Sequence, residues 1–333
     1  MLTITQKQVV TRNYTIDIFR ILGAFCVVAL HSPLGSLPNS LALSVRLCSR
    51  WAVPFFFLVS GYFAARNLRD RQSINFSKSI NYLVAIFIAS NIVYCLFYAI
   101  DNNAATTIKL TFVGLLVGQT GHLWYIGSNI FGLLILQLLV SRYSDKVLVV
   151  VALIVFLGIL VGDGYSRLTG ITLQYEVARY LTSIPFLFAG FLIARHGEFL
   201  QYLSVKLCLI SILVGLLVEY TEAYLLYTRV GAGPHNQELL IGTALLALGL
   251  FCLSLVFITP SANTLSDAGK NYSLVIYLYH PLVITLLYSV IKIGQFSAYV
   301  YWVSPFIDFV VTLLLIKAIE KTSPTVFRLL SGG

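Results

Sequence analysis

Charge is what this sequence lacks most. Only 11% of its 333 residues are charged, whereas a soluble domain carries about 25%. At 58% hydrophobic residues and a mean hydropathy of +0.88, one or two soluble domains of this length would leave much apolar surface in water. Disorder is excluded too, because a disordered chain is poor in aromatic residues and this one has 22 Phe and 20 Tyr. The composition therefore predicts a polytopic membrane protein.

Cysteine is also scarce. The five cysteines are odd in number and show no CxxC spacing, and four lie inside apolar runs, where Cys behaves as a small hydrophobic residue. We therefore expect no disulfide framework and no metal site. Long polar loops, low-complexity segments and clear internal repeats are missing as well. We expect a single membrane domain over residues 1–333, with no appended soluble domain.

Hydrophobic runs, by contrast, are abundant. A membrane-spanning helix needs about 20 mostly apolar residues, with a range of about 17–25. The stretch 110–118 is too short to span and is expected to be interfacial or re-entrant. We expect ten spans, at residues 16–35, 51–65, 80–100, 123–140, 147–162, 180–194, 207–226, 239–258, 273–291 and 298–316.

The basic residues predict the orientation and explain the net charge of +9. With the N-terminus inside, fourteen of the 22 basic residues fall in cytoplasmic segments and seven on the other side, while Arg20 lies within the first span. Lys and Arg collect in cytoplasmic loops, so membrane lipids are the expected partners and nucleic acid is not. The predicted fold class is an all-α, polytopic integral membrane helical bundle of about ten transmembrane helices, with both termini cytoplasmic.

Ionisable side chains inside a span are costly and by default mark a functional site. In the first span, Asp17, Arg20 and His31 share one stripe at the helical period. Arg20 and His31 lie about 16–17 Å apart along the axis, which puts Arg20 near the cytoplasmic face and His31 in the outer half. Interfacial anchoring and a structural hydrogen bond are simpler roles for these residues, but the shared stripe favours a functional one.

Further polar residues stand at the ends of later spans. After the second span come arginines whose guanidinium groups suit phosphate, although orientation signals are the simpler interpretation. On the far side, the HLWY segment at 122–125 also fits an interfacial aromatic belt. Asp308, near the middle of the last span, needs a cationic partner or a proton. The candidates on the two sides are Ser60, Tyr62, Arg66, Arg69 and Arg71, and Arg50, His122, Trp124, Tyr125, His280 and Asp308.

In this order and at these depths, the chain resembles the membrane-bound acyltransferase-3 family, ten-helix bacterial enzymes that modify surface carbohydrates. The resemblance covers essentially the whole length. In length the chain looks like the short O-antigen O-acetylases of this family, including those encoded by serotype-converting phages. The segments that carry it are DIFR at 17–20 with His31, VPFFFLVSGY at 53–62, RDR at 69–71, HLWY at 122–125 and YLYHP at 277–281.

The resemblance implies a multi-pass O-acetyltransferase of the bacterial cytoplasmic (inner) membrane. Its donor would be cytoplasmic acetyl-CoA, a co-substrate and not a tightly bound cofactor. Its acceptor would be a sugar hydroxyl of a polysaccharide or lipid-linked oligosaccharide, with lipopolysaccharide O-antigen expected. His31 would be catalytic together with Arg20 and Asp17. The two candidate groups above would handle the acyl-CoA and the acceptor, respectively.

The expected chemistry is direct transfer, with His31 as the general base that deprotonates the acceptor hydroxyl as it attacks the thioester. No Ser-centred elbow motif is present, and a covalent acyl-His intermediate is a variant that the sequence leaves open. A transporter or flippase for a lipid-linked saccharide or acyl donor is the alternative from another class. It predicts inverted halves with paired broken helices, and no convincing pair occurs.

Overall fold

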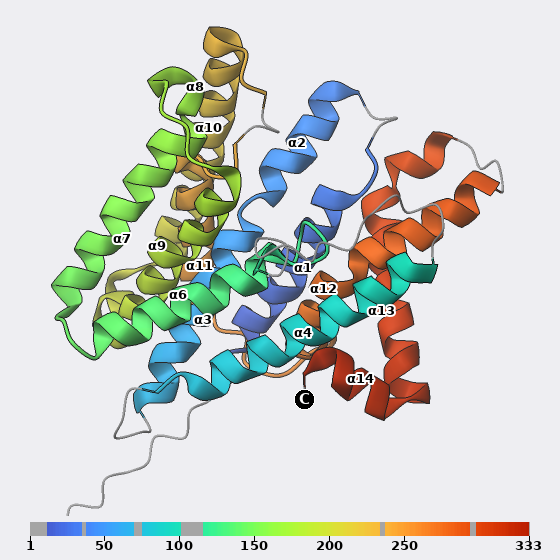
Figure 1. Cartoon of the computed structure of the whole chain (residues 1–333). Helices are drawn as coiled ribbons and strands as arrows, with labels where there is room; N and C mark the ends of the chain where they lie inside the picture. Colours follow the sequence, from blue (N-terminus) through green and yellow to red (C-terminus); the bar gives the residue numbers. More distant parts are fainter. Residues whose placement is uncertain are drawn as a thin grey trace, which may run out of the picture.

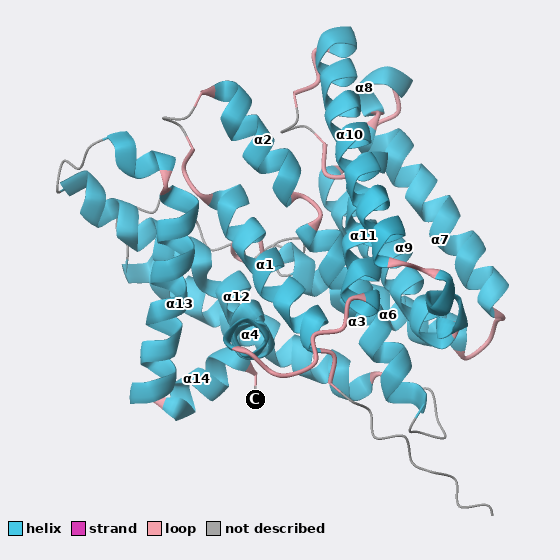
Figure 2. Ribbon diagram, turned by 180° about the vertical axis from the view of Figure 1, so that it is seen from behind, coloured by secondary structure: helices cyan, strands magenta, loops and turns pink. Residues whose placement is uncertain are grey.

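A computed structural model describes residues 12–34, 38–69, 75–100, 116–233, 237–293 and 298–332. Within these ranges the chain forms helices and connecting loops, with no strand (Figures 1 and 2). The helices are α1 (Tyr14–His31), α2 (Asn39–Ser49), α3 (Ala52–Arg69), α4 (Ser77–Ile100), α6 (Trp124–Val140), α7 (Asp145–Ile159), α8 (Ser166–Thr169), α9 (Tyr175–Arg195), α10 (Val205–Val230), α11 (Ile241–Val256), α12 (Thr264–Ile293), α13 (Ser304–Thr322) and α14 (Pro324–Ser331).

The predicted helical membrane bundle is confirmed. Every predicted span overlaps one of these helices. In the described part of the chain, seven segments are long and apolar enough to cross a membrane, with α6 and α11 as shorter apolar helices. The short helices α2, α8 and α14 were not predicted. Most of the predicted re-entrant stretch, 110–118, lies outside the described residues.

The two ends of the bundle are distinguished by where α1 begins and ends. Arg12, just before α1, pairs with Asp267 near the start of α12, and Tyr272 on α12 donates a hydrogen bond of 2.5 Å to Glu320 near the end of α13. We term this the Arg12 end and the opposite one the His31 end. Helix α1 thus begins, and helix α13 ends, at the same end of the bundle, as an even number of spans requires. The compartment at each end remains a prediction.

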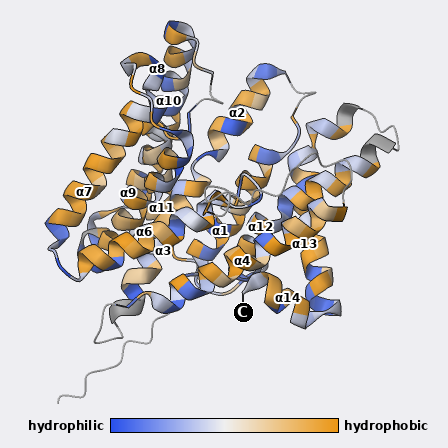
Figure 3. Cartoon of the chain, viewed as in Figure 1, coloured by the Kyte–Doolittle hydropathy of each residue, from blue (hydrophilic) through white to orange (hydrophobic). Residues whose placement is uncertain are grey.

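Apolar side chains cover the outside of the bundle, and several ionisable ones lie inside. Ile92 on α4 and Leu217 on α10 are 54% and 61% exposed, whereas Asp163, Glu219 and Asp308 are buried. Hydrophobic residues run along the outer surfaces of the helices in Figure 3. This is the arrangement expected when lipid replaces water around the protein, because polar side chains must then find partners in the interior.

Glycines bring α3 and α9 into backbone contact. A Cβ at Gly61 would collide with the backbone of Leu187, and a Cβ at Gly190 would collide with the backbone of Leu58. Small residues allow such close approach of membrane helices. The packing fixes the position of Ser60, which precedes Gly61.

The local sequence sets the bounds of α1. The side chain of Asn13 accepts hydrogen bonds from the backbone N–H groups of Thr15 and Ile16, at 2.9 and 3.1 Å, and so caps the helix. At the other end Pro33 disfavours helical geometry in the residue before it, and the helix ends at His31. The imidazole of His31 therefore projects from the last turn.

Candidate functional site

A cavity of about 590 Å³ opens around His31. We term it the His31 cavity. It joins His31 to three of the predicted acceptor-side residues, Arg50, His122 and Trp124. Its further polar lining comes from α2, α4, α9 and two loops, and consists of Arg46, Tyr98, Gln119, Thr120, Tyr175, Arg179, Thr182, Gln237 and Glu238.

The His31 ring has one nitrogen fixed and the other left for chemistry. Its Nδ1 lies 2.9 Å from the backbone oxygen of Val27. A carbonyl oxygen has no proton to give, so Nδ1 carries the hydrogen and donates it, and in the neutral ring Nε2 holds a lone pair. The side chain is exposed and lines the cavity. His31 is thus a base that a molecule in the cavity can reach.

His280 is buried beside His31, with ring centroids 4.9 Å apart. Its neighbour Pro281 lacks the N–H that would bond the carbonyl of Tyr277 one turn earlier. The Nδ1–H of His280 donates to that carbonyl instead, at 2.8 Å, and also lies 3.1 Å from the oxygen of Ile276. Pro281 thus leaves the Tyr277 carbonyl free to accept the hydrogen bond that orients His280. Nε2 of His280 has no hydrogen-bond partner among the described residues.

His122 completes a cluster of three imidazoles. Its ring centroid lies 6.3 Å from that of His31 and 5.4 Å from that of His280. Its Nε2–H donates to the carbonyl of Leu278 at 2.9 Å, and Tyr94 donates to the same oxygen at 2.8 Å. Within the described residues, no group of three His, Cys, Asp or Glu side chains is arranged to hold a metal ion.

A second cavity, of about 430 Å³, lies toward the Arg12 end. We term it the Arg20 cavity. Three predicted residues line it, Arg20, Ser60 and Tyr125, and so does the exposed Lys78 at the start of α4. Ser60 donates to the side-chain oxygen of Asn129 at 2.9 Å.

A layer of aromatic side chains lies between the two cavities. Tyr125 and Tyr277 line the Arg20 cavity, with ring centroids 5.1 Å apart. Their neighbours Trp124 and His122 line the His31 cavity. The hydroxyl of Tyr277 donates to the backbone oxygen of His122 and links the two walls. We term Tyr125, Tyr277 and His122 the aromatic layer.

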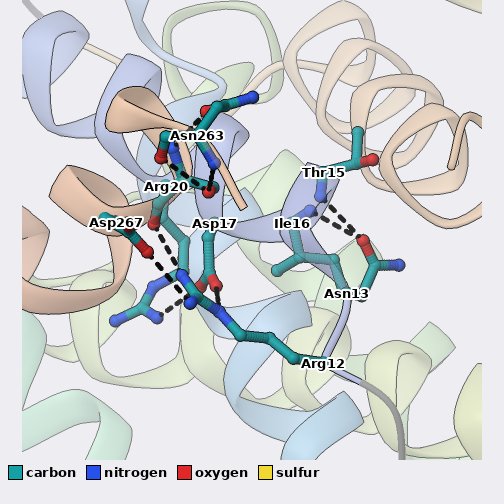
Figure 4. Close-up of polar contacts among 9 residues, drawn as sticks. Arg12, Asn13, Thr15, Ile16, Asp17, Arg20, Asn263 and Asp267 are labelled. Carbon is teal, nitrogen blue, oxygen red and sulfur yellow. Dashed lines mark hydrogen bonds and ion pairs between the residues drawn. The ribbon is translucent and has the colours of Figure 1, made fainter. Parts of the chain in front are cut away.

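Asp17 lies in an ionic network at the Arg12 end (Figure 4). Its buried carboxylate accepts from Arg12 at 2.7 Å and from Arg20 at 3.0 Å, and Arg12 also pairs with Asp267 at 3.0 Å. Burial lowers the pKa of Arg12, but its hydrogen bonds to the two carboxylates outweigh this and raise the pKa above its usual value. Asp17 is about 21 Å along the helix axis from His31. The predicted stripe therefore spans both ends, and of its three residues only His31 lines the His31 cavity.

The remaining predicted donor-side residues are partly described. Arg66 donates to the Tyr62 hydroxyl at 3.3 Å and lies over its ring. The backbone of Arg69 ends α3, but its side chain and all of Arg71 lie outside the described residues. The proposed phosphate contacts of this pair are therefore still predictions.

Two acceptor-side residues lie elsewhere than expected. Tyr125 faces the Arg20 cavity, because it follows Trp124 on α6 and points to the other side of the layer. Asp308 lines neither cavity. Its buried carboxylate accepts a 2.6 Å hydrogen bond from Ser32, the residue after His31. No cationic side chain pairs with it among the described residues, and its bond to Ser32 holds the end of α1.

Nine polar residues of the His31 cavity were not singled out in the sequence, among them Arg46, Arg179, Gln237 and Glu238. Arg179 pairs with Glu238 at 3.0 Å, and its guanidinium lies 3.9 Å from the ring centroid of Tyr175. For Arg46 and Arg179 the only signal in the sequence was their assignment to the outer side, where they entered the count of basic residues that predicts the orientation.

Comparison with known proteins gives a family and distant relatives. A family model described as an acyltransferase domain matches residues 13–319, a range that includes both cavities. An amino-acid racemase of Enterococcus faecalis is 29% identical over 303 residues, which cover 83% of this chain and 42% of the relative. A serine/alanine racemase of Enterococcus gallinarum is 28% identical over 300 residues, with 82% and 41% covered. The chain spans about two fifths of the length of these curated relatives. No solved structure matches.

Proposed function

The chain belongs to this acyltransferase family, and we propose that it moves an acetyl group from acetyl-CoA to a hydroxyl of a surface saccharide, with His31 as the general base. Lipopolysaccharide O-antigen in the bacterial inner membrane is the proposed acceptor, as in the short O-acetylases. The observation that carries the proposal is the free Nε2 lone pair of His31, exposed in the His31 cavity beside the aromatic layer.

The donor would enter from the Arg12 end. The Arg20 cavity offers Arg20 and Lys78, whose positive charges suit the phosphates of CoA. Arg66, Arg69 and Arg71 are the proposed further contacts for those phosphates. The pantetheine arm would pass the aromatic layer between Tyr125 and Tyr277, and this would bring the thioester to His31.

The acceptor would enter from the His31 end. Nε2 of His31 takes the proton of the acceptor hydroxyl as its oxygen attacks the thioester carbonyl carbon. The new C–O bond forms, the C–S bond breaks, and His31 returns the proton to the departing thiolate. The hydrogen bond from Nδ1–H to Val27 then holds the transient imidazolium in place and is strengthened by its charge.

We propose neither amino-acid racemisation nor saccharide flipping for this chain. The racemase names belong to proteins more than twice as long as the region matched here, so racemisation is not assigned to this chain. A flippase would also use two cavities on opposite sides of a layer. It gives no role to a histidine whose tautomer is fixed for proton transfer, and it predicts a saccharide that changes side without gaining an acyl group.

The test is mass spectrometry of envelope saccharides from bacteria that express the chain. We expect one added acetyl group per modified sugar with the wild type and none with His31→Gln. The matched control is His196→Gln, because His196 is exposed at the Arg12 end and lines neither of the two cavities. Acetylation by His31→Gln would overturn the assignment of the base. Translocation of unmodified saccharide by the wild type would favour the flippase.

A further inference from the structure

The His31 cavity has an excess of positive charge. Three arginines line it, Arg46, Arg50 and Arg179, and Glu238 is the only acidic residue among the described lining. The charge of Arg179 is already matched, because it pairs with Glu238 at 3.0 Å and lies over the rings of Tyr175 and Trp124, at 3.9 and 5.1 Å. Arg46 and Arg50 bring the further positive charge of the cavity.

Arg46 contributes a charge that has no counterion in the described part of the chain. It lies on α2, is half-buried, and takes part in no ion pair or hydrogen bond found among the described residues. Arg50 follows at the end of the same helix, also half-buried. A guanidinium held in a partly desolvated wall is favoured by an anion that forms charge-assisted hydrogen bonds with it. Carboxylates and phosphates both provide the required pair of oxygens.

Uncharged polar groups of the same wall also lack partners. Gln237 is only 5% exposed and Thr120 only 8%. Neither the side-chain amide of Gln237 nor the hydroxyl of Thr120 has a hydrogen-bond partner in the described part of the chain. Buried polar groups are nearly always bonded, and leaving one unbonded is costly. Both residues line the His31 cavity, so a ligand rich in hydroxyl groups would supply the missing bonds.

We infer that the acceptor bound in this cavity is an acidic saccharide, a sugar that carries a carboxylate or a phosphate. Arg46 and Arg50 hold the anionic group, and Gln237 and Thr120 bond the hydroxyls. Glu238 keeps Arg179 in place through their ion pair. That the bound saccharide is the acceptor rests on the proposed function. That the His31 cavity binds an acidic saccharide does not depend on it.

The experiment measures binding to the purified chain in lipid nanodiscs without any acyl donor. Two matched pairs of probes are compared by calorimetry: galacturonate against galactose, and glucose 6-phosphate against glucose. We expect at least one acidic sugar to bind about tenfold or more tightly than its neutral partner, since hydrogen bonds to charged groups are worth more than neutral ones. The pair with the larger preference identifies carboxylate or phosphate.

Variants assign the effect to residues. Arg46→Gln and Arg50→Gln should each remove most of the preference, and Arg46→Lys should keep part of it. Arg167→Gln is the matched control, because Arg167 is exposed on α8 and does not line the cavity. If Arg50→Gln fails to fold, the half-buried Arg46 still decides the matter. Equal binding of acidic and neutral sugars, or an undiminished preference in Arg46→Gln, would overturn the inference.

The two proposals fail separately. His31→Gln should bind the acidic sugar like the wild type, because the base is not the anchor. Anion-selective binding without any acyl transfer would leave the binding site standing and refute the proposed reaction. Acyl transfer to neutral saccharides with no acid preference would do the reverse.

Discussion

Replacing Pro281 with alanine should stabilise the protein and at the same time lower its activity. Pro281 cannot donate to the carbonyl of Tyr277, which accepts instead from Nδ1–H of His280 at 2.8 Å. An alanine supplies the missing backbone N–H. We expect the helix to close its hydrogen bonds at this turn, so that the carbonyls of Tyr277 and Leu278 turn into the helix and away from His280 and His122.

The expected magnitudes have opposite signs. Proline in a helix interior is about 3 kcal/mol less favourable than alanine, whereas losing the hydrogen bonds of His280 and His122 costs about 1 kcal/mol each. The net gain in stability is about 1 kcal/mol, which corresponds to about 2 °C in melting temperature for a chain of this size. Activity should fall by about tenfold or more, equivalent to about 1.4 kcal/mol in the barrier.

The assays are thermal unfolding in detergent and acetyl transfer in membranes, and α9 supplies a matched control. Pro185 also lies inside a helix and is buried, but no histidine bonds to the carbonyl one turn before it among the described residues. Pro185→Ala should therefore leave acetyl transfer intact. Full activity in Pro281→Ala, or an equal loss in both variants, would refute the role given to the proline.

Three other substitutions test the packing, the aromatic layer and the ionic network. Gly61→Ala should prevent folding, because its Cβ would collide with the backbone of α9. Gly158→Ala is the control: no atom lies within 4 Å of its Cβ, so it should be neutral or stabilising by up to about 1 kcal/mol. Expression level and melting temperature compare the two variants, and equal values would contradict the packing argument. Tyr277→Phe should lower acetyl transfer severalfold at a stability cost of about 1 kcal/mol, and unchanged kinetics would mean that the layer does not depend on this hydroxyl. Arg12→Ala removes one partner of Asp17 and should lower the melting temperature with no change in KM for acetyl-CoA; a raised KM would show that the network takes part in donor binding.

The spans could be predicted from the sequence because lipid makes one simple demand, a long apolar run for each crossing. The helix α2 could not, since its 11 residues include serines, an asparagine and an arginine and resemble a loop. That helix carries Arg46, whose place in the His31 cavity was therefore not predicted, although Arg50 just after the helix was. Periodicity describes one helix at a time and does not show which residues of different helices meet.

The site shows the same limit. His31, His122 and His280 were each singled out, but their contact depends on how α12 packs against α1 and on the loop before α6. The bond from His280 to Tyr277 follows from the missing N–H of Pro281, which the sequence contains, yet the tautomer of His31 depends on a distance to Val27 that only the structure provides. Asp308 was expected to need a cationic partner or a proton, and the structure shows that it accepts a hydrogen bond from the hydroxyl of Ser32.

The most direct test of the central claim is acetyl transfer across a sealed membrane. Proteoliposomes would receive labelled acetyl-CoA at the Arg12 end and an acidic saccharide at the His31 end. We expect labelled saccharide and free CoA on opposite sides with the wild type and with His196→Gln, and neither product with His31→Gln. Labelled saccharide formed by His31→Gln, or formed only when donor and acceptor share one side, would contradict it.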